Sequence, residues 1–299
     1  MKWLRRLLGG LVLWRLFAPP LHPAFRPPQE HPWRLGGRTV FVADQEFLVR
    51  ETGPVDGRPL VLIHGLGGSS LSEWYQIGPK LAAERRVIMI DHRSHGLSPA
   101  ASSRYEVEDV ADDIAGILDE LGLGVVDVAG FSMGGAIAQA LAHRHPARVR
   151  RLALIATFAV YPVERRVASL VGAVVTRAWE RLTGLGTPEV RTTYLLATGA
   201  VERKHARWLW EETHRRNPDA GAQATLALLR FDSRPWVGRL EAETLVVIPG
   251  RDQLIPPSWQ YGMAGLIPGV EVVELPGAHH EVVWTHPERL TDELTAFLA

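Results

Sequence analysis

The chain contains no cysteine among its 299 residues. This absence excludes a thiol nucleophile, a disulfide framework and a zinc site built on cysteine ligands. A net charge is also lacking, because 33 Lys and Arg residues balance 33 Asp and Glu residues. Without an excess of positive charge, no electrostatic field draws the chain to nucleic acid, so we expect a small or uncharged partner and no nucleic acid.

The amino-terminal region lacks an uninterrupted apolar run of the length that a membrane span requires. Lys2, Arg5 and Arg6 precede an apolar stretch, Leu7–Ala18, which Arg15 interrupts. No small-x-small cleavage site follows this stretch. The pattern therefore favours a cationic helix rather than a spanning one.

Residues 1–18 fit two structures, and periodicity does not separate them. The helix could lie at a bilayer surface as a peripheral contact, or it could pack on the protein itself. Localisation is accordingly expected to be cytoplasmic or membrane-associated. The proline-rich stretch Pro19–Pro32 predicts a semi-extended linker. Residues 1–37 are thus expected to precede the folded domain.

From Arg38 onward, short β-branched apolar runs alternate with helix-length amphipathic segments. This alternation is typical of βαβ units and of a parallel sheet covered on both faces. We expect an α/β fold with a mostly parallel central sheet of about eight strands and helices on both faces. The predicted strands span residues 38–43, 46–51, 60–64, 86–91, 125–131, 149–156, 244–249 and 270–275, and the first two form an antiparallel edge pair. The predicted helices span residues 71–83, 107–121, 133–143 and 287–298.

The alternation of strands and helices stops between residues 159 and 239. This stretch is rich in Arg, Trp and Leu, has helical periodicity and contains no convincing strand. It predicts a helical cap over the carboxyl edge of the sheet. The cap would interrupt a core formed by residues 38–158 and 240–299.

The segment Gly130-Phe131-Ser132-Met133-Gly134 follows an apolar strand and opens a helix. A serine on so tight a turn is held exposed, and side chains at the two glycine positions would collide with the chain as it doubles back. The Met133 amide lies at a helix N-terminus, where it can donate to a developing oxyanion. Ser132 is therefore the predicted nucleophile.

A second oxyanion donor is expected in His64-Gly65-Leu66-Gly67-Gly68, which directly follows a buried strand. The glycines let the backbone approach a substrate, and the Leu66 amide would face Ser132. A simple glycine turn is the alternative interpretation.

Serine is a weak nucleophile at neutral pH and needs a base that a third group orients. Asp252 follows the strand predicted at residues 244–249, and His279 and His280 follow the last strand. All three residues are thus expected at the carboxyl edge of the sheet. Their order after the serine is the one used by hydrolases with this type of elbow.

From about Arg38 to Ala299 the chain resembles the α/β-hydrolase superfamily, and within it the lidded esterase, lipase and carbon-carbon hydrolase members. Five segments occur in the family's order: the His64-Gly65 loop, the turn from Asp91 to Ser98, the serine elbow, the Asp252 loop and the terminal histidine loop. The resemblance implies an oxyanion hole formed by the Leu66 and Met133 amides.

The chain departs from the family pattern at two positions. Ser94 stands where the family often has glycine, which affects local turn geometry. His279-His280 stands where the family often has Gly-His, so the match favours His280 as the base and leaves His279 as the alternative.

Other chemistry is less well supported by the sequence. A carboxylate in place of Ser132 would indicate haloalkane dehalogenase or epoxide hydrolase chemistry, which the serine excludes. Asp91, His92 and His95 could suggest a metal site, but no further carboxylate cluster accompanies them. We therefore expect no metal and no cofactor.

Aromatic residues of the predicted cap have two interpretations. They could line an apolar acyl pocket, or they could pack the cap onto the core. These residues are Trp179, Trp208, Trp210, Trp236 and Tyr194.

The predicted activity is hydrolysis of a carboxylic ester with a hydrophobic moiety, through a Ser132, His280 and Asp252 triad and an acyl-enzyme. The expected partner is a small hydrophobic ester. The alternatives are carbon-carbon bond hydrolysis, perhydrolysis or acyl transfer on the same triad, and a low-turnover ligand-binding receptor with this fold.

Overall fold

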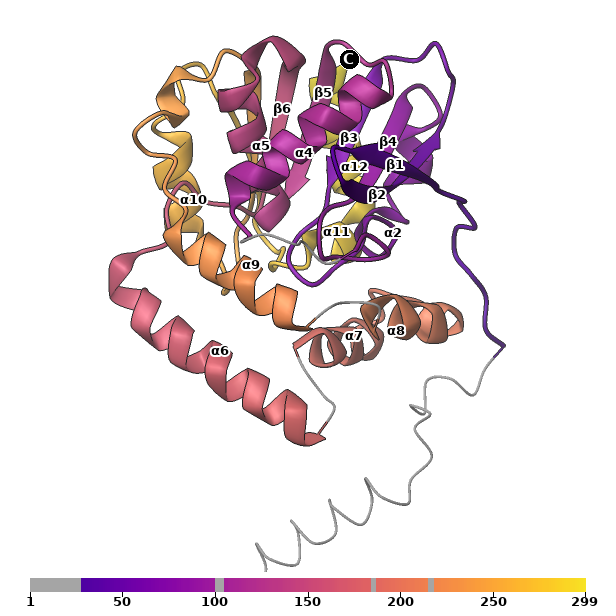
Figure 1. The fold of residues 1–299 in the computed structure, drawn as a ribbon. Coiled ribbons are helices and arrows are strands. Elements are labelled where there is room, and N and C mark those ends of the chain that lie inside the picture. The colour runs from indigo at the N-terminus through magenta and orange to yellow at the C-terminus, as the bar shows by residue number, and fades with distance from the viewer. Residues whose placement is uncertain (1–27, 100–104, 184–186, 215–217) are drawn as a thin grey trace, which may run out of the picture.

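The computed structural model describes residues 28–99, 105–183, 187–214 and 218–299. Its centre is an eight-stranded sheet with the order β1-β2-β4-β3-β5-β6-β7-β8 (Figure 1). β2 pairs antiparallel with β1 and β4, and all other neighbours are parallel. The predicted α/β fold class is confirmed. The strands are β1 (Arg38–Val42), β2 (Gln45–Thr52), β3 (Pro59–Ile63), β4 (Arg86–Asp91), β5 (Val126–Phe131), β6 (Val149–Ile155), β7 (Glu243–Pro249) and β8 (Glu271–Leu275).

Helices cover both faces of this sheet because the central strands are apolar on both sides. One buried cluster joins the sheet to α4, α5 and α10, and a second joins it to α2, α3, α11 and α12. These helices are α2 (Ser70–Trp74), α3 (Gly78–Leu81), α4 (Val107–Glu120), α5 (Met133–Arg144), α10 (Pro257–Ala264), α11 (Val282–Thr285) and α12 (Pro287–Leu298).

The prediction of a single helix at residues 71–83 is wrong. The chain forms α2 and α3 instead, with a break between Trp74 and Gly78. Pro79 lies in the first turn of α3. Proline has no backbone N–H to donate to the preceding turn, and its ring clashes there, so the helix restarts at this point.

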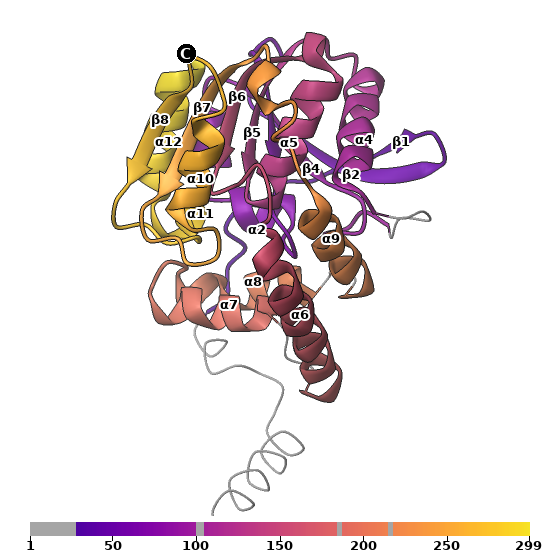
Figure 2. The same ribbon diagram turned by 90° about the vertical axis from the view of Figure 1, so that its left-hand side faces the viewer.

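Helices α6, α7, α8 and α9 are inserted between β6 and β7 (Figures 1 and 2). Both views place them below the carboxyl edge of the sheet, on the side where the chain emerges from its parallel strands. Within the described part of this insertion, strand pairing is limited to a single bridge between Val160 and Asp232. The helix bounds are α6 (Val163–Thr183), α7 (Thr187–Ala197), α8 (Ala206–His214) and α9 (Pro218–Arg230).

The predicted helix at residues 1–18 lies outside the described residues. Among the helices that the structure describes, none combines the length and the apolar character needed to cross a bilayer. The boundaries predicted for a separate cap, 159 and 239, stay a prediction.

Candidate functional site

Ser132 occupies the sharp turn between β5 and α5, with φ of 55° and ψ of −118°. L-residues rarely adopt this backbone conformation, so the surrounding fold must hold it. A Cβ atom at Gly130 would lie 2.3 Å from the Gly134 carbonyl oxygen, and one at Gly134 would lie 2.2 Å from the Ile63 oxygen. Glycine is therefore required at both positions. The turn itself leaves no room for a side chain at Gly130, and the neighbouring strand β3 leaves none at Gly134.

The Ser132 hydroxyl, the His280 ring and the Asp252 carboxylate form one hydrogen-bonded row. His280 Nε2 lies 3.0 Å from Ser132 Oγ, and its Nδ1 lies 2.8 Å from Asp252 Oδ2. The three residues come from the loops after β5, β7 and β8. The histidine that reaches the serine is thus His280 rather than its neighbour His279.

Asp252 is buried, and each of its oxygens has partners. Oδ1 accepts backbone N–H bonds from Leu254 at 2.9 Å and Ile255 at 2.8 Å. Oδ2 accepts from the Gln260 amide at 3.2 Å as well as from His280. Gln260, in α10, escaped the sequence analysis, because no helix was predicted there. These bonds hold the Asp252 carboxylate in place beside the His280 ring.

The loop after β3 approaches the serine closely. A Cβ atom at Gly65 would lie 3.2 Å from Ser132 Cβ, so the backbone passes directly beside the serine. Leu66 lines the same cavity as Ser132. Met133 begins α5, and N–H groups in the first turn of a helix have no partner inside that helix. Both predicted oxyanion donors therefore border the serine.

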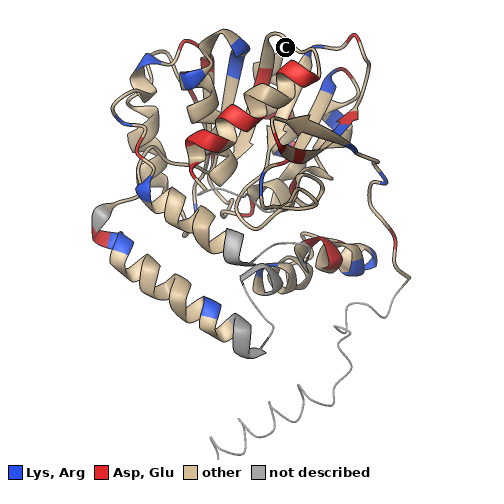
Figure 3. Cartoon of the chain, viewed as in Figure 1, with Lys and Arg blue, Asp and Glu red and all other residues tan. Residues whose placement is uncertain are grey.

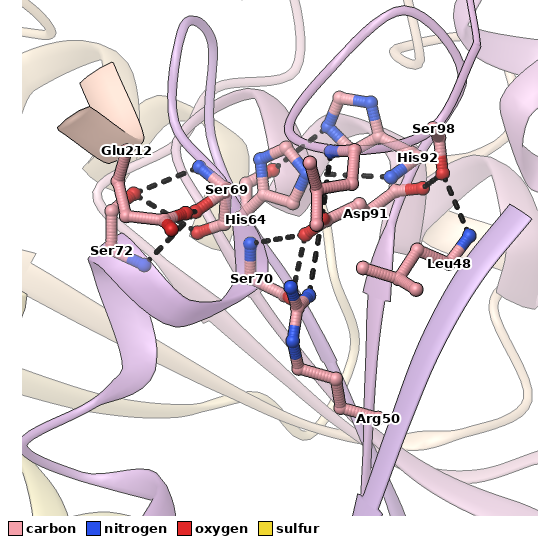
Figure 4. A network of polar contacts seen from close by, with 11 residues as sticks. Leu48, Arg50, His64, Ser69, Ser70, Ser72, Asp91, His92, Ser98 and Glu212 are labelled. Atoms are coloured by element: carbon pink, nitrogen blue, oxygen red, sulfur yellow. Dashed lines mark hydrogen bonds and ion pairs between the residues drawn. The ribbon is translucent and has the colours of Figure 1, made fainter. Parts of the chain in front are cut away.

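The turn after β4 supports the His64 loop through a buried polar network (Figure 4). Asp91 Oδ1 accepts bonds from the Ser70 N–H at 2.8 Å and the Ser70 hydroxyl at 2.6 Å. Its other oxygen accepts from Arg50 at 3.1 Å. Burial alone would raise the pKa of Asp91, but Arg50, His64 and the Ser70 bond hold that pKa below its usual value. Ser94, where the family pattern has glycine, adopts a φ of 68°.

The histidines around this turn pack on one another. The rings of His64 and His92 stack with centroids 3.8 Å apart, and His95 lies 4.3 Å from His92. Burial lowers the pKa of His95 to about 3 and holds the pKa of His92 well below 6.5. Within the described residues, no group of three or more His, Asp or Glu side chains has a metal-binding arrangement. Burial therefore disfavours a charge on His92 and His95, and their rings pack against His64 in the loop after β3.

Glu73 is a second buried carboxylate beside the site, and no pattern in the sequence pointed to it. Its Oε2 accepts the Gly65 N–H at 2.6 Å, and its Oε1 lies 3.7 Å from the Arg191 guanidinium. Burial raises the pKa of Glu73, against the opposing effects of Arg191 and His64. Helical spacing marked Glu73 only as part of a helix, so its role was visible only in three dimensions.

The inserted helices touch the same loop through two polar residues. Arg191, in α7, donates to the Gly67 carbonyl at 3.3 Å, and its guanidinium lies 5.0 Å from the centroid of the Trp284 ring. Glu212, in α8, accepts a bond from the Ser69 hydroxyl at 2.9 Å (Figure 4). The geometry of this loop therefore depends on the insertion as well as on the sheet.

A cavity of about 720 Å³ opens over Ser132 and His280. Most of its walls are apolar, with side chains such as Leu66, Phe158 and Leu228. Among the five aromatic residues with two interpretations, Tyr194 lines the cavity, and Trp284 from α11 lines it as well. The four tryptophans at positions 179, 208, 210 and 236 do not belong to the described lining, which for them excludes the pocket interpretation. Trp208, for example, is buried against Tyr75.

Comparison with known proteins identifies related sequences. The family described as alpha/beta hydrolase fold matches residues 58–199. The putative carbamate hydrolase RutD of Variovorax paradoxus is 30% identical over 259 residues, which cover 83% of this chain and 94% of that protein. The dihydrolipoyllysine-residue acetyltransferase component of the acetoin cleaving system of Pseudomonas putida is 32% identical over 83% of this chain. The chain spans 65% of the length of that relative.

Solved structures show the same architecture. The enol-lactonase of Burkholderia xenovorans is 26% identical with a TM-score of 0.75, over 87% of this chain and 99% of that one. An esterase of Thermogutta terrifontis is 26% identical with a TM-score of 0.72, over 88% and 98% of the two chains. A membrane phospholipase A, described as a bacterial virulence factor, is 26% identical with a TM-score of 0.72, over 100% and 98%. The chain belongs to the α/β-hydrolase superfamily and is an α/β-fold hydrolase.

Proposed function

We propose that this chain hydrolyses carboxylic esters that carry a hydrophobic group, with Ser132 as nucleophile, His280 as base and Asp252 as the residue that orients the histidine. The observation that carries the proposal is the row from Ser132 Oγ to His280 Nε2, 3.0 Å, and from His280 Nδ1 to Asp252 Oδ2, 2.8 Å. Because an ionised carboxylate only accepts, Nδ1 carries the proton and Nε2 is left free to accept one.

In the first half of the reaction, Ser132 Oγ attacks the ester carbonyl carbon while its proton passes to His280 Nε2. The Leu66 and Met133 N–H groups hold the oxygen that becomes negative. The bond to the alcohol then breaks, and the alcohol leaves with the proton from His280. In the second half, a water molecule gives a proton to His280 while the water oxygen attacks the acyl carbon. The bond between the acyl carbon and Ser132 Oγ then breaks, His280 returns the proton to Oγ, and the acid leaves. No cofactor takes part.

The cavity supports a hydrophobic acyl group, since its walls are mostly apolar. Esters of membrane lipids are the narrower substrate class that we propose, because the similarity to the membrane phospholipase A extends over the whole chain. A peripheral membrane contact through residues 1–18, with Lys2, Arg5 and Arg6, belongs to the same proposal.

The test is the variant Ser132→Ala. We expect at least about a 10⁴-fold loss of turnover with p-nitrophenyl esters, together with loss of labelling by a fluorophosphonate probe. The matched control is Ser258→Ala, at an exposed serine in α10, which should retain both. Ester turnover that persists in Ser132→Ala would refute the assignment. Probe labelling of the unchanged protein without turnover of any ester would favour a ligand-binding receptor instead.

A further inference from the structure

The outer face of α6 is apolar and exposed. Val167, Val171, Val174 and Val175 are 70%, 58%, 69% and 61% exposed, respectively. We call these four residues the valine face. The other three follow Val167 by four, seven and eight residues, which places all four on one side of the helix. An exposed apolar surface of this kind on a soluble fold marks a contact with another apolar surface.

Charge is missing from the same part of the helix. Residues 167–176 contain no Lys, Arg, Asp or Glu. Figure 3 shows this stretch in tan, whereas the core helix α4 carries several acidic residues along its outer side. A surface helix that faces only water normally displays charged side chains. The basic residues of α6 flank this stretch, with Arg165 and Arg166 before it and Arg177 and Arg181 after it.

The opposite side of α6 borders the catalytic cavity. Ser169, Ala173 and Thr176 line that cavity together with Ser132. Their spacing of four and three residues places them on one face of the helix, turned away from the valine face. One helix therefore separates the cavity from the exposed apolar surface.

The start of the described chain lies at the same end of the molecule. The Glu30 N–H donates to the Lys204 carbonyl at 2.8 Å, and the Gln29 amide oxygen accepts from the Arg207 N–H at 3.0 Å, so this segment is attached beside α8. Figures 1 and 2 place this attachment at the level of the inserted helices, away from the carboxyl terminus. The 27 residues that precede the described chain contain five basic residues and an apolar stretch, and they are connected to the molecule on the side of the insertion.

We propose that the valine face is a membrane-contact surface, which enters the headgroup and upper acyl region of an anionic bilayer and holds the Ser132 cavity beside the lipid. The occupant is a bilayer rather than a second copy, because the described chain begins beside α8, at the end of the molecule that carries the valine face, and the sequence before it contains basic residues and the apolar stretch Leu7–Ala18. The inference rests on the proposed ester hydrolysis only for the role of the cavity. The membrane contact itself can be tested separately.

The absence of cysteine allows a site-specific test in the full chain. Val174→Cys, labelled with the environment-sensitive dye NBD, reports the polarity around the valine face. Val125→Cys is the matched control, because this valine is 54% exposed and precedes β5 at the opposite edge of the sheet. With vesicles of equal parts phosphatidylglycerol and phosphatidylcholine, we expect a blue shift and at least about a twofold gain in fluorescence at position 174 and none at position 125.

A second experiment measures the contribution of the face to binding. The triple variant Val171→Gln, Val174→Gln and Val175→Gln keeps the helix propensity and the net charge. We expect at least about tenfold weaker binding to the same vesicles. Turnover of a soluble p-nitrophenyl ester should stay within about twofold of the unchanged protein, since none of the three side chains lines the cavity. The matched control replaces three exposed valines of the core, Val55, Val125 and Val272, with Gln.

The outcomes separate this inference from the proposed function. Unchanged vesicle binding in the triple variant, with no dye shift at position 174, overturns the membrane contact and leaves ester hydrolysis untouched. A change of oligomeric state in the triple variant, measured by light scattering, with unchanged vesicle binding identifies a second copy as the occupant and also overturns it. Failure of the unchanged protein to hydrolyse any soluble ester contradicts the proposed function. The vesicle-binding measurements then still test the membrane contact of the valine face.

Discussion

The core helix α4 and the inserted helix α6 are both amphipathic, but they direct their apolar sides differently. In α4, Val110, Ile114 and Ile117 are buried against the sheet, and the acidic residues other than Asp113 lie on the partly or fully exposed side. In α6, valines face outward, and the small residues Ser169 and Ala173 face the cavity. An apolar stripe therefore identifies a helix without identifying which side lies inside. The difference also indicates that the core is held by packing, whereas the insertion leaves space for a ligand.

The largest expected effect comes from adding a methyl group to a glycine of the core, and the same change in the insertion serves as the comparison. In the core, Gly134→Ala brings Cβ within 2.2 Å of the Ile63 carbonyl oxygen, so β3 or the elbow must shift. We expect a loss of about 3 kcal/mol or more in the free energy of unfolding, together with loss of ester turnover. Urea unfolding followed by tryptophan fluorescence measures the first effect.

The matched variant in the insertion is Gly172→Ala. A Cβ atom there meets no other atom within 4 Å, and alanine is the better helix former. We expect a gain of up to about 1 kcal/mol in the free energy of unfolding. Equal losses in the two variants would contradict the distinction between a packed core and an open insertion.

A smaller effect is expected where the two regions meet, at Glu73. Glu73→Ala leaves the buried Gly65 N–H without its acceptor, and the oxyanion loop loses its support. We expect kcat to fall about tenfold to a hundredfold, with a lesser change in KM, because the loop acts mainly on the transition state. Steady-state kinetics with a soluble ester checks this split.

Glu73→Gln is the conservative control. Its amide oxygen can accept the same Gly65 N–H, so we expect it to recover most of kcat although the ion pair with Arg191 is lost. If the Gln variant is as slow as the Ala variant, the negative charge of Glu73 is the important property, and the support of the loop is not sufficient.

The smallest effect concerns acid stability, which we assign to the core. The pKa of His95 is lowered by burial and by His64 to about 3, and the unfolded residue titrates near 6.5. Between these values the unfolded chain binds a proton that the folded chain does not, so stability present above about pH 6.5 is lost as the pH falls. In His95→Gln we expect the slope of unfolding free energy against pH, measured with urea between about pH 6 and 5, to fall by up to about 1.4 kcal/mol per unit. An unchanged slope would place the acid-sensitive groups elsewhere.

The strands and the elbow were predictable from local sequence. Buried parallel strands are continuously apolar, and a serine between two glycines at the end of such a strand has few other structural explanations. The helix boundaries were less accurate at residues 71–83, because the apolar spacing continues across Pro79 although the proline interrupts the helix there. Helix α10 was missed, since its sequence, with prolines at its start and Gly262 inside it, has weak helical character.

The sequence by itself determined the alternation of strands and helices, the position of Ser132 on its turn, and the order of the serine, acid and histidine loops. These features depend on residues that are neighbours in the chain, so local periodicity and backbone sterics specify them. Only the tertiary structure decided that His280 rather than His279 reaches Ser132, that Gln260 and Glu73 support the site, and that the valines of α6 face outward. Each of these depends on side chains brought together from distant segments, and no local pattern specifies which of them will meet.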